Sequence, residues 1–410
     1  MDSVAQGVQP PRNSVGEPGG THGPAARLRP FGTSIFATIS ALAAKHGAVN
    51  LGQGFPDFDG PEFAKEAAIA AIRAGKGQYE RMSGVPALNR AIADRWRIDS
   101  GIEVDPDLEI TVTSGCTEAI AATLLGLLDP GDEVLLVEPY YDSYRACVAM
   151  AGAVPRYVRM RPPRFRLPIE ELEAAITART RGILVNTPHN PTGRVYDDAE
   201  LAAIAELARR HDLTVISDEV YEKLAFARPH RSIATLPGMR ERTIVLSSLG
   251  KTFSLTGWKI GWAIAPPGLT AAVRAAHQFL TFSSATPLQH AAAAALRCEE
   301  TYYAELLDGY LRRRGRLLDA LDGAGFRTFV PEGSYFVIAD CAPLGFDDDA
   351  AFCTHLIESA GVAAIPVGAF LHDRGPVEEG CRTLVRFAFC KRDETLDEAA
   401  RRLKARFRAR

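Results

Sequence analysis

The stretch "RGILVNTPHNPTGRVYDDAELAAIAELARRHDLTVISDE", residues 181–219, joins two short apolar runs through one amphipathic segment. The runs are nearly continuous in Val, Ile and Leu, as is typical of strands buried on both faces of a parallel sheet. Between them, apolar residues recur from Leu201 to Ala208 with the spacing of one helix face, and Asp197 with Glu200 marks the start of that helix. The stretch therefore predicts a strand–helix–strand unit.

Similar units extend the pattern from about residue 105 to residue 265. Further predicted strands are "LEITVTSG", "DEVLLVEP", "VPRYVRM", "RTIVLSS" and "KIGWAIAP". Repeated strand–helix–strand units predict an α/β domain with helices on both faces of the sheet. After residue 298 a long helical pattern precedes "GSYFVIAD", "AAIPV" and "TLVRFAFC". We therefore expect a leader (1–29), an N-terminal arm (30–60), a large domain (61–297) and a smaller α+β domain (298–410) that the arm completes.

The composition excludes several classes of protein. The chain has 410 residues and a formal net charge of -3, without the basic footprint of a nucleic-acid-binding protein. No apolar run approaches the length of a membrane helix. The seven cysteines include no CxxC pair, and the histidines show no metal-ligand spacing, which predicts reduced thiols, a cytoplasmic location and no metal site. The Gly/Pro-rich leader is interpreted as disordered, with a cleaved targeting segment as the alternative.

Polar side chains follow the ends of five predicted strands. They are Cys116 and Thr117, Tyr140 and Tyr141, His189 to Gly193, Asp218 to Tyr221, and Lys251. Ligands of open α/β sheets bind beyond the carboxyl ends of the strands. We therefore expect one binding site along this rim.

A lysine and an aspartate at one site suggest pyridoxal phosphate. This cofactor needs an amine for an imine bond, here Lys251, and an acid that keeps its ring nitrogen protonated, here Asp218. Asp218 alone equally suits a helix cap or a salt bridge. Tyr221 and Asn190 can hydrogen-bond the phenolate oxygen of the ring, although Asn190 also suits a turn before proline.

The phosphate group requires donors of its own. Gly115 precedes a predicted helix whose first backbone N–H groups and dipole favour an anion. Ser248 can add a hydroxyl and Lys259 a positive charge. Lys259 taken alone is also typical of a solvated loop.

Four motifs in this order, "LGQGFPDFDGPE", "NTPHNPTGRVY", "ISDEVYEKL" and "SSLGKTFSLTGWKIGW", resemble the class I aminotransferases of fold type I. The resemblance runs from about Pro30 to the C-terminus. Within the family the chain resembles the kynurenine, glutamine and methionine aminotransferases and actinobacterial N-succinyldiaminopimelate aminotransferase-like enzymes. It implies a three-layer large domain with a mostly parallel sheet. It also implies ping-pong transfer of an amino group between an L-amino acid and a 2-oxo acid through a Lys251 aldimine.

The resemblance also assigns residues to the cofactor. Tyr141 would stack on the ring, and the phosphate would be held by Ser248, Lys259 and the backbone around Gly115, Cys116 and Thr117. Tyr79 would reach the phosphate of the other subunit. A homodimer with shared active sites follows from that assignment.

The substrate carboxylate calls for a bidentate arginine. In "TLVRFAFC", period-two spacing places Arg386 on the opposite face from Val385 and Phe387, where a solvent-facing arginine is the simpler interpretation. The resemblance instead matches Arg386 to the arginine that binds the substrate carboxylate. It places the backbone of Gly54 nearby, with Asn190 also at the substrate.

The side-chain pocket departs from the kynurenine enzymes. Phe36 and Phe282 fall at positions that line this pocket in relatives and favour an apolar or neutral side chain. Thr117 and Ser283 replace a tyrosine and a histidine of those enzymes. We therefore expect a roomier, more polar pocket and a substrate longer or more polar than kynurenine.

Three alternatives share these residues or this scaffold. A C–S β-lyase would expel a β-substituent after the same deprotonation at Cα. An oxidase or other specialised biosynthetic enzyme would consume oxygen without an oxo-acid acceptor. A ligand-binding regulator without activity would carry an appended DNA-binding module, for which the Gly/Pro-rich leader is unsuited.

Overall fold

The computed structural model describes residues 23–373 and 380–407. Residues 1–22, most of the predicted leader, lie outside the described residues. At the end of that leader, Ala26–Leu28 forms a short 3-10 helix.

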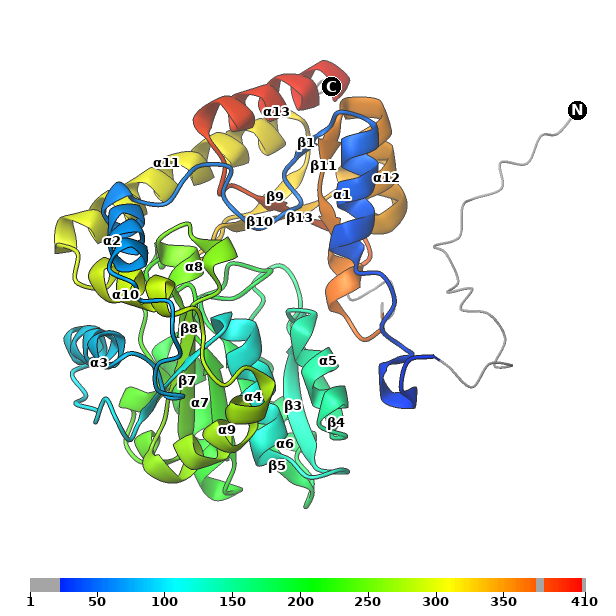
Figure 1. Ribbon diagram of the computed structural model, residues 1–410. Helices are drawn as coiled ribbons and strands as arrows, with labels where there is room; N and C mark the ends of the chain where they lie inside the picture. The colour runs from blue at the N-terminus through cyan, green and yellow to red at the C-terminus, as the bar shows by residue number, and fades with distance from the viewer. Residues whose placement is uncertain (1–22, 374–379, 408–410) are drawn as a thin grey trace, which may run out of the picture.

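A seven-stranded sheet forms the centre of the larger part of the molecule, in the order β2-β8-β7-β6-β5-β3-β4 (Figure 1). Neighbouring strands run parallel, except that β8 is antiparallel to both β2 and β7. The strands are β2 Ile110–Thr113, β3 Glu133–Glu138, β4 Val154–Arg159, β5 Thr180–Asn186, β6 Thr214–Asp218, β7 Thr243–Ser248 and β8 Gly261–Ile264. The predicted α/β fold with a mostly parallel sheet is confirmed.

Helices cover both faces of this sheet because its strands are apolar on both sides. In β3, Leu135 and Val137 pack on the face covered by α7, whereas Val134 and Leu136 pack on the face covered by α4, α5 and α9. The helices of this part are α2 Glu62–Arg73, α3 Pro86–Ser100, α4 Gly115–Leu127, α5 Ser143–Met150, α6 Ile169–Ala174, α7 Asp198–Arg210, α8 Leu249–Thr252, α9 Pro267–Leu280 and α10 Thr286–Ala295. Three layers result.

Helix α7 begins where the sequence predicts. The Asp197 carboxylate accepts a hydrogen bond from the Glu200 backbone N–H at 3.0 Å, and the Glu200 carboxylate accepts one from the Asp197 N–H at 2.9 Å. This reciprocal capping box satisfies two N–H groups that the helix leaves without partners.

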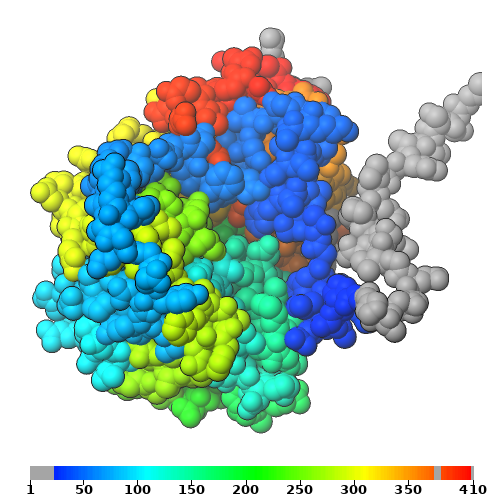
Figure 2. Space-filling view, in the orientation of Figure 1, coloured from blue at the N-terminus to red at the C-terminus, as the bar shows by residue number. Residues whose placement is uncertain are grey.

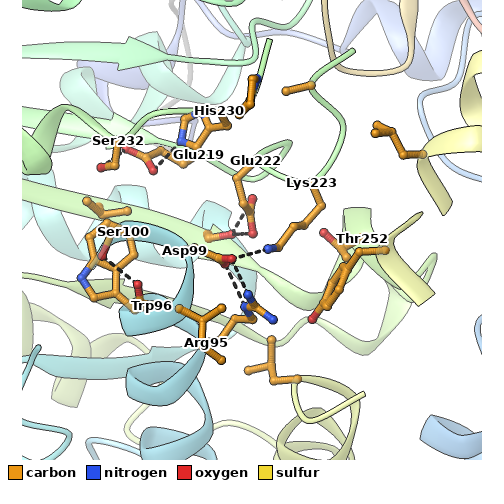
Figure 3. Close-up of a pocket in the computed structure, with 18 of the residues that line it drawn as sticks. Arg95, Trp96, Asp99, Ser100, Glu219, Glu222, Lys223, His230, Ser232 and Thr252 are labelled. Carbon is orange, nitrogen blue, oxygen red and sulfur yellow. Dashed lines mark hydrogen bonds and ion pairs between the residues drawn. The ribbon is translucent and has the colours of Figure 1, made fainter. Parts of the chain in front are cut away.

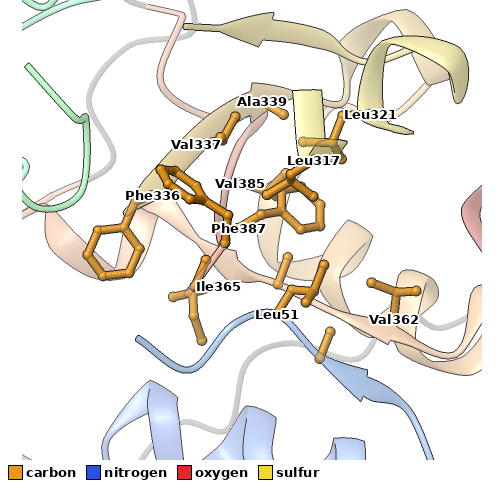
Figure 4. Packing of buried hydrophobic residues seen from close by; sticks show 14 of the residues in the cluster. Leu51, Leu317, Leu321, Phe336, Val337, Ala339, Val362, Ile365, Val385 and Phe387 are labelled. Carbon is orange, nitrogen blue, oxygen red and sulfur yellow. The ribbon is translucent and has the colours of Figure 1, made fainter. Parts of the chain in front are cut away.

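The smaller part combines both ends of the described chain. The two-residue strand β1 Val49–Asn50 pairs parallel with β11 Val362–Ala363, and β9 Arg327–Phe329, β10 Phe336–Asp340, β12 Ile365–Pro366 and β13 Leu384–Ala388 form an antiparallel sheet. Helices α1 Ile35–Lys45, α11 Glu300–Gly323, α12 Asp349–Ala360 and α13 Asp393–Arg406 belong to this part. Leu51 packs in one core with Leu317, Val337 and Phe387 (Figure 4). The N-terminal segment is therefore an integral part of this core.

Figure 2 shows this N-terminal segment running over the surface of the larger part before it reaches the smaller part. Among the described residues, no helix has the length and apolar character needed to cross a membrane.

Candidate active site

A cavity of about 260 Å³ lies at the carboxyl ends of the central strands. Eleven of the residues expected from the sequence line it: Gly54, Gly115, Cys116, Thr117, Tyr141, Asn190, Asp218, Tyr221, Ser248, Lys251 and Lys259. They come from the ends of five strands, from the segment just before the antiparallel strand β8, and from the N-terminal segment. The parallel sheet brings them together because its strands end at the same edge.

Asp218, the last residue of β6, is an acid held away from water. It is 4% exposed, and burial raises the pKa of its carboxyl group. Its Oδ2 accepts a hydrogen bond of 2.6 Å from the Tyr144 hydroxyl, while its Oδ1 accepts one of 3.3 Å from the Val220 N–H. The Cys116 thiol lies 3.7 Å from Oδ1. Three donors thus fix the orientation of this carboxylate.

Sequence reasoning missed Tyr144. It lies in α5, three residues after the predicted Tyr141, which precedes this helix, and the two rings meet edge to face at 5.7 Å. The sequence "YYDSY" does not identify Tyr144, because its contact with the end of β6 depends on how α5 packs on the sheet.

Lys251 lies in the short helix α8, directly after β7. Burial lowers the pKa of its ammonium group. Its Nζ stands 5.7 Å from the ring centre of Tyr221 and 5.8 Å from that of Tyr335. Within the described residues it forms no salt bridge, and burial makes this amine easier to deprotonate than an exposed lysine.

The start of α4 and Lys259 form an anion-binding corner. Gly115 opens the helix with φ at 76°, a conformation that glycine adopts without strain. A β-carbon at this position would come within 3.2 Å of the Lys259 Nζ. The first turn of this helix, Ser248 and Lys259 all line the cavity, and the free N–H groups of a first helical turn favour an anion.

Arg386 is buried, in contrast to the solvent-facing position that the strand pattern alone favours. It is 1% exposed, and burial lowers the pKa of its guanidinium to about 10. It donates to the Asn190 Oδ1 at 2.9 Å and to the Gly52 carbonyl at 2.8 Å. Three phenylalanine rings surround it, at 4.0, 4.8 and 5.3 Å from its Cζ (Phe336, Phe370 and Phe36).

The charge of Arg386 is left without an acidic partner. In residues 23–373 and 380–407 it forms no salt bridge, and its Nε has no hydrogen-bond partner. A buried guanidinium of this kind is strongly suited to a carboxylate that arrives with a ligand. Asn190 joins this position to the cavity, because it lines the cavity and also accepts from Arg386.

Gly54 is expected to contact the substrate through its backbone, and this stays a prediction. Arg386 bonds the carbonyl of Gly52, while the Gly54 carbonyl accepts from the Tyr335 hydroxyl at 2.6 Å. Gly54 still lines the cavity, and a β-carbon there would come within 2.7 Å of the Phe336 ring. Gly54 therefore allows the close approach of this loop to the ring.

Tyr79 and Phe282 lie away from the cavity of their own chain. Their rings meet edge to face at 5.6 Å and are exposed, with Tyr79 at 83%. Phe282 follows α9 with φ at 65°, and this turn directs its ring to Tyr79. Phe282 is not among the residues that line this cavity, so its expected place in the substrate pocket stays a prediction.

The residues fit pyridoxal phosphate. Gly115, Ser248 and Lys259 would hold the phosphate, Asp218 the ring nitrogen, Lys251 the aldehyde carbon, and Tyr141, Asn190 and Tyr221 the ring. The fit rests on the uncompensated Lys251 amine and on the carboxylate of Asp218, which the protein has buried at the same cavity.

Comparison with known proteins gives the same family. The model of the family "Aminotransferase class I and II" matches residues 46–403. The probable N-succinyldiaminopimelate aminotransferase DapC of Mycobacterium tuberculosis is 50% identical over 385 residues, which cover 92% of this chain and 97% of the relative. Methionine aminotransferase of Escherichia coli is 42% identical over 382 residues, with 93% and 98% covered.

Solved structures agree with this assignment. That of N-succinyldiaminopimelate aminotransferase from Mycobacterium tuberculosis has a TM-score of 0.90 at 50% identity, covering 93% of this chain and 100% of the other. The predicted family, fold and cofactor are thus confirmed. The chain belongs to the class I and II aminotransferases, enzymes that transfer amino groups with the help of pyridoxal phosphate.

Proposed function

We propose that Lys251, Asp218 and Arg386 are the three principal groups in the transfer of an amino group from an L-amino acid to a 2-oxo acid. The observation that carries this assignment is that Lys251 and Asp218 line one cavity, to which Asn190 joins Arg386. Each comes from a different part of the chain, and each charge is withdrawn from water.

Each group has a distinct role in the proposal. Bound pyridoxal phosphate supplies a ring that withdraws electrons from the substrate Cα. Lys251 binds this cofactor covalently and, once released, accepts the Cα proton at Nζ, for which its lowered pKa is suited. Asp218, held by Tyr144, keeps a proton on the ring nitrogen. Arg386 binds the substrate carboxylate and so aligns Cα with Lys251.

We propose N-succinyldiaminopimelate as the amino donor, with methionine as the second candidate. The relative of that name at 50% identity supports the first. The small Thr117 at the cavity wall also favours a long, polar side chain. The 42% identical methionine aminotransferase and the apolar Phe36 support the second.

The test is a panel of amino donors with 2-oxoglutarate and pyruvate as acceptors. It contains N-succinyldiaminopimelate, methionine, kynurenine, glutamine and phenylalanine. We expect the highest kcat/KM for N-succinyldiaminopimelate and parallel double-reciprocal plots, the sign of a ping-pong mechanism. A higher value for methionine would reverse the order of the candidates. Release of pyruvate from cystathionine without an acceptor would indicate the β-lyase, and oxygen consumption the oxidase.

We further propose a homodimer with shared active sites. The exposed pair of Tyr79 and Phe282, with the 85% exposed Phe279 nearby in sequence, supports a covered aromatic surface. Mixing inactive K251A with inactive Y79A subunits should restore part of the activity, because one site of the mixed dimer would then be intact. A mixture that stays inactive although mixed dimers form would contradict shared sites.

We also propose a cytoplasmic location. All seven cysteines are free thiols, which suits a reducing compartment.

A further inference from the structure

A second, larger cavity lies behind the cofactor cavity. It has a volume of about 790 Å³ and is lined by side chains of α3, the segment after β6, the β7–α8 connection and the start of α11 (Figure 3). Of the residues assigned to the cofactor or the substrate, only Ser248 is among those that line it.

The two cavities share a wall formed by the ends of β6 and β7. Along the segment after β6, Asp218 and Tyr221 line the cofactor cavity, whereas Glu219 and Glu222 line the second cavity. Ser248 lines both. The peptide that carries Ser248 leads directly to Lys251, so the second cavity lies next to the cofactor site but is separated from it by this wall.

Each basic side chain that is labelled in Figure 3 pairs with an acidic side chain. Lys223 lies 2.6 Å from the Asp99 carboxylate (Figure 3). Arg95 pairs with Asp99 at 2.6 Å and also with Glu300, so these two cations have two acids. His230 lies 2.8 Å from the Glu219 carboxylate. These pairs neutralise one another within the protein.

Glu222 differs from the other acids. Its two carboxylate oxygens accept only from the Ser247 hydroxyl, at 3.1 and 3.2 Å (Figure 3). Among the described residues no cation forms a salt bridge with it. The cavity thus contains one carboxylate that a ligand could neutralise.

One buried hydroxyl group of the lining also lacks a partner. Thr252 is 3% exposed, and its hydroxyl has no hydrogen-bond partner in the described part of the chain. Buried polar groups are nearly always paired, so each unpaired one calls for an explanation. The remaining lining is rich in large apolar rings, namely Trp96, Phe253 and Trp262.

We propose that this cavity binds a small organic cation, with its ammonium group on Glu222 and its apolar body against the aromatic lining. A polar atom of the same molecule would pair with Thr252. The single unmatched carboxylate sets the ligand charge at one positive unit, and the aromatic wall favours an apolar body over a bare metal ion.

The test uses the cofactor-loaded enzyme and three probes of equal length: 4-phenylbutylamine, 4-phenylbutanol and 4-phenylbutyrate. Isothermal titration at about pH 8.5, where the Glu222 carboxyl group is ionised, should give binding of the amine that is about 10-fold or more tighter than that of the alcohol, because a hydrogen bond to a charged group carries that difference. The carboxylate should bind more weakly still. The visible absorbance of the cofactor, followed in parallel, should stay unchanged.

Variants locate the binding. Glu222→Gln keeps the size and the acceptor for Ser247 but removes the charge, so it should weaken the amine about 10-fold and leave the alcohol unaffected. Glu222→Asp should retain the preference for the amine. Thr252→Val keeps the shape of the side chain but removes its hydroxyl. A probe that carries an added hydroxyl group to pair with Thr252 should lose this contribution in the variant, which provides a second test. Equal binding of the three probes, amine affinity that is the same in Glu222→Gln, or amine binding that changes the cofactor absorbance would each overturn the proposal.

Discussion

Replacing Glu222 by glutamine should stabilise the protein above neutral pH and change little in acid. Burial raises the pKa of Glu222 to about 7 from 4.5, Lys223 and His230 oppose this rise, and Asp99 adds to it. The folded protein therefore holds the Glu222 proton more tightly than the unfolded chain does. The contribution of Glu222 to the unfolding free energy is complete below about pH 4.5 and is lost as the pH rises to about 7.

The magnitude follows from the two pKa values. The difference between about 7 and 4.5 corresponds to roughly 3 kcal/mol of lost stability at alkaline pH, at about 1.4 kcal/mol per pH unit. Part of this stability is already lost at about pH 5. The unfolding free energy gained by Glu222→Gln over the wild type should therefore grow by about 2.5 kcal/mol between about pH 5 and about pH 8.5. Glutamine is neutral throughout this range.

The assay is urea unfolding of the wild-type and Glu222→Gln proteins at one protein concentration, both free of cofactor. The difference in unfolding free energy between them is measured at each pH, so that contributions of all other groups cancel. Glu206→Gln is the control: Glu206 is exposed, Arg209 lowers its pKa, and its replacement should bring no gain as the pH rises. The reasoning would be refuted if the gain in unfolding free energy of Glu222→Gln over the wild type stayed constant or fell as the pH rises.

The other predictions concern the cofactor and substrate groups. Lys251→Ala should abolish the visible absorbance of lysine-bound cofactor and lower kcat by roughly 10²–10⁴, as expected for loss of a general base; survival of that absorbance would contradict the assignment. Arg386→Lys should lower kcat/KM for amino acids by about 100-fold because the bidentate contact is lost, with cofactor absorbance as the control for folding. Tyr144→Phe removes the 2.6 Å hydrogen bond to Asp218 and should weaken cofactor binding about 10-fold in a fluorescence titration. Tyr140→Phe, which has no hydrogen bond to Asp218 among the described residues, should bind cofactor like the wild type.

Much of the fold follows from local sequence patterns. The apolar runs of the central strands and the capping residues of α7 depend only on near neighbours, so they could be read from the sequence. Likewise, the residues after each strand meet because the sheet is parallel. In this respect the rim of the cofactor cavity was predictable.

The parts that could not be predicted depend on distant contacts. The burial of Arg386 results from Gly52 and Phe36, which lie more than 300 positions earlier in the chain. The hydrogen bond between Tyr144 and Asp218 depends on how α5 packs on the sheet. That Glu222 lacks a cationic partner depends on the other acids that pair with the neighbouring cations in the folded chain.

The pairing of Val49 with Val362 has a consequence for synthesis on the ribosome. Strand β1 is synthesised first and lacks its pairing partner β11 until roughly 300 further residues have left the exit tunnel. The central sheet can assemble during this time. Leu51, which is fully buried in the finished protein, stays exposed during this interval. Chaperone binding to the nascent N-terminal segment should therefore persist until the last third of the chain has emerged.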